Sequence, residues 1–166
     1  MEVVTEARVL KLELPAAALE AGIRTFAAGG QWQRAVDMLE SMTADGQHAQ
    51  HDTSVAVFRA LAEGQQADRS LQLLEVMEQT GRGVPSTVRN LVVRTCATSG
   101  RLDRALELLE AMADSAMQSG LSDDEEGGGR GDVFIEGVTF SAVAGECLKQ
   151  GLSAKAEEVL DWRDYL

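Results

Sequence analysis

Three arginines recur along this chain at a constant interval. Arg24, Arg59 and Arg94 are each separated by 35 residues. A guanidinium is permanently charged, and its five N–H donors match the oxygens of a phosphate or of a carboxylate. If the three side chains line up, they form either a track for nucleic-acid phosphates or a series of ion pairs with acids of neighbouring segments. The sequence leaves both alternatives open.

Each arginine lies four residues after another residue of interest, namely Glu20, Val55 and Asn90. A spacing of four puts two side chains on the same face of an α-helix, one turn apart. In a fourth copy of the pattern, Ser141 holds the position that Asn90 holds in the third copy. Four residues later this copy has Gly145 in place of an arginine. The sequence therefore predicts a helix face with a polar position and a basic position in successive copies.

The elements that carry these residues are themselves repeated. The segments RAVDMLESMTAD from Arg34, RSLQLLEVMEQT from Arg69 and RALELLEAMADS from Arg104 align at the same interval of 35, with their Leu, Glu and Met columns in register. A weaker fourth copy, KAEEVLDWRDYL, begins at Lys155. A fixed period of this length is typical of stacked supersecondary units.

Within one period the pattern predicts a helix, a short glycine turn and a second helix. In the third copy an apolar stripe from Val88 ends at Ser99, and a second apolar stripe includes Leu109 and Met112. The predicted turn glycines are Gly30, Gly64, Gly100 and Gly151. One such hairpin cannot bury its apolar face alone. We therefore expect an all-α fold, a right-handed α-solenoid of three to four helix-turn-helix repeats of about 35 residues.

The acidic, glycine-rich stretch before the fourth copy interrupts the period and is predicted to be a flexible insertion. It contains Arg130-Gly131-Asp132, which we attribute to chance, and Ser122 before four acids, which we interpret as a solvated loop. The expected segments are an N-terminal segment (1–15), repeats 1 to 3 (16–52, 53–86 and 87–119), the insertion (120–137) and a truncated repeat 4 (138–166).

Composition sets further bounds. The chain has 166 residues, of which 45% are hydrophobic and 4% aromatic, enough to bury a core. No apolar run is long enough for a membrane span. The net charge of −12 argues against a nucleic-acid partner unless the charge is unevenly distributed. Cys96 and Cys147 occupy the same place in two repeats among apolar neighbours, and we expect buried thiols there.

No pattern of catalytic chemistry is present. His48 and His51 lie close to Asp52 in the sequence, and two histidines with a carboxylate could hold a metal ion. No third strong ligand has a suitable spacing, so we expect a polar turn. No Ser/His/Asp or Cys/His arrangement and no phosphate-binding glycine loop occurs. We predict that the chain is not an enzyme and that it uses no metal, cofactor or small-molecule substrate.

The repeat resembles the pentatricopeptide repeat family. The resemblance rests on the period, on the motif A-x-x-L-[LF]-E-x-M at 35–42 and 105–112, on VTFS at 138–141 and on a G-x-x-P-like ending at 81–85. The tetratricopeptide repeat is the main competitor, but it usually has a period of 34 and a small residue where this chain has methionine.

The resemblance implies that the first helices line a concave surface that binds single-stranded RNA, about one base per repeat. It assigns base choice to the early first-helix position and to the last residue of the repeat, near Gln50 and Ser86. Asn90 and Ser141 can hydrogen-bond a base edge, whereas Val55 cannot and Glu20 would repel a phosphate. The candidate RNA-binding residues are Asn90, Ser141, Arg24, Arg59 and Arg94.

RNA binding in organellar RNA metabolism is thus the leading hypothesis, in a mitochondrion or plastid by resemblance. No transit peptide is recognisable, so a cytoplasmic site stays open. The alternative is a protein–protein scaffold subunit, which the acidic charge and incomplete base-choice positions favour. The apolar residues at the end of the last hairpin, including Trp162 and Leu166, predict association through that hairpin.

Overall fold

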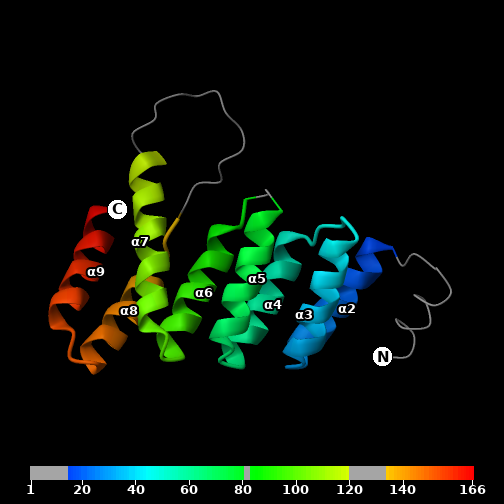
Figure 1. Cartoon of the computed structure of the whole chain (residues 1–166), viewed down its shortest axis with the longest axis horizontal. Coiled ribbons are helices and arrows are strands. Elements are labelled where there is room, and N and C mark those ends of the chain that lie inside the picture. Colours follow the sequence, from blue (N-terminus) through cyan, green and yellow to red (C-terminus); the bar gives the residue numbers. More distant parts are fainter. Residues whose placement is uncertain (1–14, 81–82, 120–133) are drawn as a thin grey trace. The chain divides into compact units, whose positions relative to one another are not determined.

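The computed structural model describes residues 15–80, 83–119 and 134–166, and within them every regular element is an α-helix (Figure 1). The predicted N-terminal segment and most of the insertion, with Arg130-Gly131-Asp132 and Ser122, fall outside the described residues. Each repeat contributes a first and a second helix. These pairs are α2 (Ala16–Ala28) and α3 (Trp32–Ala44), α4 (His51–Glu63) and α5 (Ala67–Gln79), α6 (Ser86–Thr98) and α7 (Leu102–Ser119), and α8 (Gly137–Lys149) and α9 (Ser153–Tyr165).

The predicted all-α class of helical hairpins is confirmed, with small shifts in the boundaries. First helices begin one or two residues before the predicted repeat starts, at His51, Ser86 and Gly137. His51 therefore opens α4 and is not part of the preceding loop. The second helix of the third repeat has 18 residues where the other helices have 13, and it continues past Met112 to Ser119.

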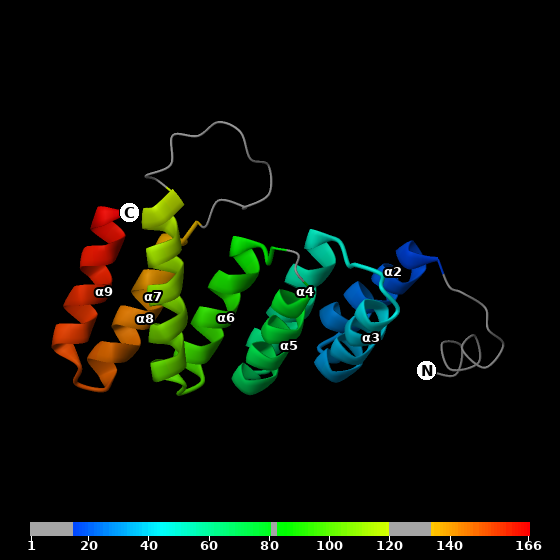
Figure 2. The ribbon, with the colours of Figure 1, turned by 45° about the horizontal axis from the view of Figure 1, so that its top comes forward.

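The chain divides into two compact units, residues 1–60 and 61–166, and the division falls within α4. In the first unit α2 packs against α3. In the second unit α6 packs against α5, α7 and α8, and α8 also packs against α7 and α9 (Figure 2). The two first helices α6 and α8 are thus direct neighbours, and each is paired with its own second helix.

One turn geometry closes all four hairpins. An amide just after the first helix donates to a carbonyl five residues earlier, as in the bond of 2.8 Å from Arg101 to Cys96. This bond requires a left-handed residue between the helices. That residue is glycine in three repeats, with φ of 77° at Gly100 for example. In the second repeat it is Gln65, with φ of 52°. Gly64, the turn glycine of this repeat in the sequence, comes one residue before this place.

The core follows the repeat register. A small side chain in the first turn of each second helix is almost completely buried: Ala35, Ser70, Ala105 and Ala156. Leu109 and Met112 are buried as predicted, with 0% and 2% of their surface exposed. Cys96 and Cys147 are buried free thiols, which confirms their assignment to the core. The leucine column and the small-residue column of the period are therefore packing positions.

Candidate nucleic-acid interface

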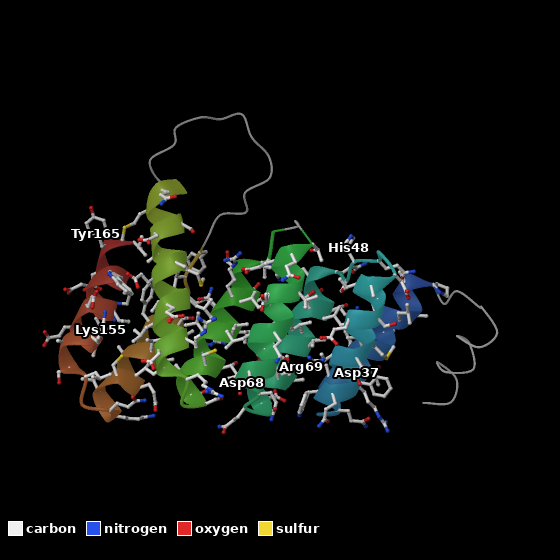
Figure 3. The ribbon with its side chains drawn as sticks, in the orientation of Figure 1. Asp37, His48, Asp68, Arg69, Lys155 and Tyr165 are labelled. Carbon is white, nitrogen blue, oxygen red and sulfur yellow. The ribbon has the colours of Figure 1, made fainter. Side chains whose placement is uncertain are left out.

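Charge is divided unevenly between the two kinds of helix. The four first helices together carry five basic and four acidic side chains, whereas the four second helices carry five basic and thirteen acidic ones. Figure 3 shows examples of the latter set, with Asp37 on α3 and Asp68 on α5. The acidity of the described helices therefore belongs to the second helices, and the first helices are close to neutral.

In the first unit, the early position of the first repeat is part of a junction with the next repeat. Glu20 is buried, and its carboxylate accepts the main-chain N–H of Gln50 at 2.8 Å. One turn along α2, Arg24 donates to the hydroxyl of buried Thr53 at 2.9 Å and lies 3.6 Å from the Glu20 carboxylate. The Glu20 carboxylate thus caps the start of α4, and Arg24 balances its charge.

In the second unit, Asn90 holds the repeat position of Glu20, and its side chain makes four hydrogen bonds. Its side-chain amide donates to the carbonyls of Ser86 and Phe134, each at 2.8 Å. Its side-chain oxygen accepts from the main-chain N–H of Glu136 at 3.0 Å and from the hydroxyl of Thr139 at 2.7 Å. These four bonds occupy both donors and both acceptor positions of the amide.

Asn90 is also completely buried. A direct contact with a base therefore stays a prediction that would require the amide to leave its four partners. We assign Asn90 instead to the junction between the third and fourth repeats, as the counterpart of Glu20 in the first. In both junctions the acceptor receives the N–H of the residue that immediately precedes the next first helix, Gln50 or Glu136.

The second repeat has neither half of this arrangement. Its early residue is Val55, which has no acceptor, and the residue before its next first helix is Pro85, which has no N–H. The place of Thr53 and Thr139 is taken by Val88. The residue types of the second repeat are thus consistent with each other, because the acceptor and the N–H are absent together.

The three arginines accordingly differ. Arg94 forms an ion pair with Glu136 at 2.9 Å, and Arg24 is engaged by Glu20 and Thr53. Arg94 thus pairs with an acid beyond its own repeat, whereas the acid beside Arg24 belongs to its own helix and its link to the next repeat is the Thr53 hydroxyl. Arg59 is exposed, and no hydrogen bond or ion pair engages its side chain within residues 15–80, 83–119 and 134–166. It is the member of the series that is available to an external anion.

Ser141 is the remaining predicted site residue. It lies exposed on α8, and its hydroxyl donates to the carbonyl of Gly137 at 3.0 Å. A hydroxyl bonded within its own helix keeps an acceptor function toward solvent. The structure thus brings Asn90 and Arg94 together at one junction, and it places Ser141 on the surface of the adjacent first helix.

Two kinds of reactive centre can be checked directly, an activated thiol and a metal cluster. Burial raises the pKa of the Cys96 thiol to about 11, and burial also raises the pKa of Cys147, so neither is an activated nucleophile. In the part of the chain that the structure describes, no three His, Cys, Asp or Glu side chains come together as a metal site. None of the described helices is both long and apolar enough to cross a membrane.

The junction residues that follow the insertion were not predicted from the sequence. Phe134, Glu136 and Thr139 all contact Asn90 through hydrogen bonds, although they lie more than 40 residues away in the chain. A signal was available, because Thr139 and Thr53 hold the same place in their repeats. The spacing of 46 between Asn90 and Glu136 hides the match with the spacing of 30 between Glu20 and Gln50.

Comparison with known proteins places this architecture. Residues 1–112 match the family model described as pentatricopeptide repeat-containing protein. No curated protein matches the chain. Among solved structures, the crystal structure of the pentatricopeptide repeat protein PPR10 from maize is similar, with a TM-score of 0.58 and 20% sequence identity. The match covers 99% of this chain and 21% of the maize chain, so this chain spans about a fifth of that protein's length.

Proposed function

We propose, because this chain belongs to the pentatricopeptide repeat family, that it is a non-catalytic recognition module that binds single-stranded RNA along its first helices. Proteins of the family are generally RNA-binding repeat proteins without catalytic activity. The proposal names the surface of this chain that makes the contact. It also names Arg59, on α4 of the first unit, as a phosphate contact and Ser141, on α8 of the second unit, as a polar contact.

The observation that carries the proposal is the separation of charge between the two kinds of helix. An RNA backbone is repelled by the thirteen acids on the second helices, but it meets a nearly neutral set of first helices. Within that set the acids Glu20 and Glu146 have cationic partners, Arg24 at 3.6 Å and Lys149 at 2.8 Å. Arg59 then adds a charge that forms no ion pair or hydrogen bond with another described side chain.

A comparison of RNA forms tests the proposal. The chain is incubated at low salt with a labelled single-stranded RNA and with the same strand annealed to its complement. Unstacked bases of a single strand are accessible, whereas a duplex hides them in its stack. We expect filter retention of the single strand and little retention of the duplex. Equal retention of both forms, or no retention of either, would contradict the proposal.

Two finer expectations belong to the same proposal. Because the family is commonly organellar, we place the protein in a mitochondrion or plastid, and microscopy of the tagged full-length protein tests this.

We also expect a protein contact at the last hairpin, where Leu148, Leu152, Tyr165 and Leu166 are exposed (Figure 3 labels Tyr165). Light scattering should show self-association that Leu148→Glu abolishes. A monomer at high concentration would rule out self-association there.

A further inference from the structure

An exposed aromatic ring stands at the start of the fourth repeat. Phe134 has 66% of its surface exposed, whereas Phe58 and Phe140 are almost completely buried. Leaving a phenyl ring in water forfeits about 1.5–3 kcal/mol of burial free energy. The ring lies outside the helices, in the short segment that leads into α8, so no packing requirement of the repeat explains it.

The backbone of Phe134 is nevertheless fixed against α6. Its N–H donates to the hydroxyl of Ser86 at 3.2 Å, and its carbonyl accepts from Asn90 at 2.8 Å. The next residue, Ile135, is buried, and the one after that, Glu136, pairs with Arg94 at 2.9 Å. The exposed ring is therefore presented by an anchored segment and does not sit on a freely moving tip.

The same place in the other junctions gives a comparison. Phe134 lies two residues before Glu136, the last residue ahead of α8. The equivalent residues ahead of α4 and α6 are His48 and Gly83, and both are exposed. His48, like Phe134, has a planar ring. Figure 3 labels it beside the connection that leads into α4. The two repeats whose early residue is a polar acceptor are thus followed by a ring at this place, and the second repeat, with Val55, is followed by Gly83.

We propose that Phe134 is a stacking platform for an unpaired nucleobase at the junction between the third and fourth repeats. The proposal rests on the single-stranded RNA binding proposed above and adds a contact at a place outside the repeat helices. Stacking needs one accessible ring face and tolerates every base, because every base has a π-face. The site therefore adds affinity without selecting a sequence.

The surroundings favour a base over an apolar protein surface. A stable protein interface buries on the order of 1,000 Å² and has an apolar centre. Beside Phe134 the structure places the polar groups of Ser86 and Asn90 and the ion pair of Arg94 with Glu136, and the exposed apolar side chain nearest in the sequence is Val138. Arg94 balances the Glu136 carboxylate, so this described acid does not present an unpaired charge to a phosphate next to the stacked base.

The test uses the full chain, fluorescein-labelled single-stranded oligo(U) and oligo(A), and fluorescence anisotropy at low salt. Phe134→Leu keeps an apolar side chain of similar size but removes the ring, and Phe134→Tyr keeps the ring. We expect Phe134→Leu to weaken binding about tenfold for both RNAs and Phe134→Tyr to bind like the wild type. Val76→Ala removes an exposed apolar side chain on the second helix α5 and serves as the matched control, with unchanged binding.

The outcomes separate this inference from the proposed function. If the wild type binds both RNAs and Phe134→Leu binds them equally well, the stacking site is refuted and the RNA-binding function stands. An equal loss in Phe134→Leu and Phe134→Tyr would also refute stacking. If the wild type binds neither RNA, the proposed function and the stacking site fall together. Equal melting temperatures of the variants confirm that their folds are comparable.

Discussion

At the scale of single residues, the same repeat position accepts a hydrogen bond from the next repeat in some copies and makes no such bond in another. Glu20 and Asn90 each accept the N–H that opens the following repeat. Val55 lacks an acceptor, and Pro85 lacks the donor that would need one. A buried N–H without a partner costs about 1–3 kcal/mol. The early residue of a first helix and the residue ahead of the next first helix must therefore change together.

Asn90→Ala should therefore be strongly destabilising. It leaves two carbonyls, an amide N–H and the Thr139 hydroxyl without their partner. We expect the free energy of unfolding to fall by about 2–3 kcal/mol in a urea titration. Ser141→Ala is the matched control, because it changes the same repeat position where the side chain is exposed, and it should cost less than about 0.5 kcal/mol. Similar costs for the two variants would contradict the junction role of Asn90.

At the scale of the helices, most of the fold was predictable because packing repeats with the sequence. The Leu and small-residue columns return every 35 residues and are buried in the second helices, and of the Met column Met42 and Met112 are buried while Met77 is half-buried. The junction contacts were not predictable in the same way. Each joins a side chain to a main-chain group of the next repeat, and the residue types differ from copy to copy, as Glu20, Val55 and Asn90 illustrate.

The turn of the second repeat shows how an element can deviate from its sequence signal. Gly64 suggested a glycine turn, but the hairpin geometry needs its left-handed residue one place later, and Gln65 adopts φ of 52° there. A non-glycine residue in this conformation costs about 1–2 kcal/mol. The turn bond of 2.8 Å from the Gln66 N–H to the Leu61 carbonyl thus places the left-handed residue at Gln65, against the local preference for glycine.

This turn provides a paired stability test. Gln65→Gly should raise the free energy of unfolding by about 0.5–1 kcal/mol, because relief of the strain exceeds the added flexibility of the unfolded chain. Gly100→Ala, at the equivalent turn of the next repeat, should lower it by about 1–2 kcal/mol, since a Cβ there meets no atom within 4 Å and only φ is affected. Thermal melts of both variants measure the effect. Changes of the same sign would contradict the shared turn geometry.

At the scale of the whole molecule, the net charge of −12 is a poor guide to the partner. The described helices place thirteen acids on one kind of helix and four on the other. The basic residues of the first helices are mostly engaged within the protein, as the Arg94–Glu136 and Arg89–Glu78 pairs show. We therefore expect RNA binding to depend on few phosphate contacts and to rely substantially on contacts with the bases.

The salt dependence of binding to single-stranded RNA tests this account most directly. Affinities are measured by anisotropy over a series of salt concentrations for the wild type, for Arg59→Ala and for Arg104→Ala. Arg104 is a matched control, because it removes the same charge from the second helix α7, where its guanidinium pairs with Glu107. We predict a shallow slope for the wild type, a slope smaller by about 0.7 for Arg59→Ala, and no change for Arg104→Ala. An Arg59→Ala slope equal to that of the wild type, or a loss confined to Arg104→Ala, would contradict binding along the first helices.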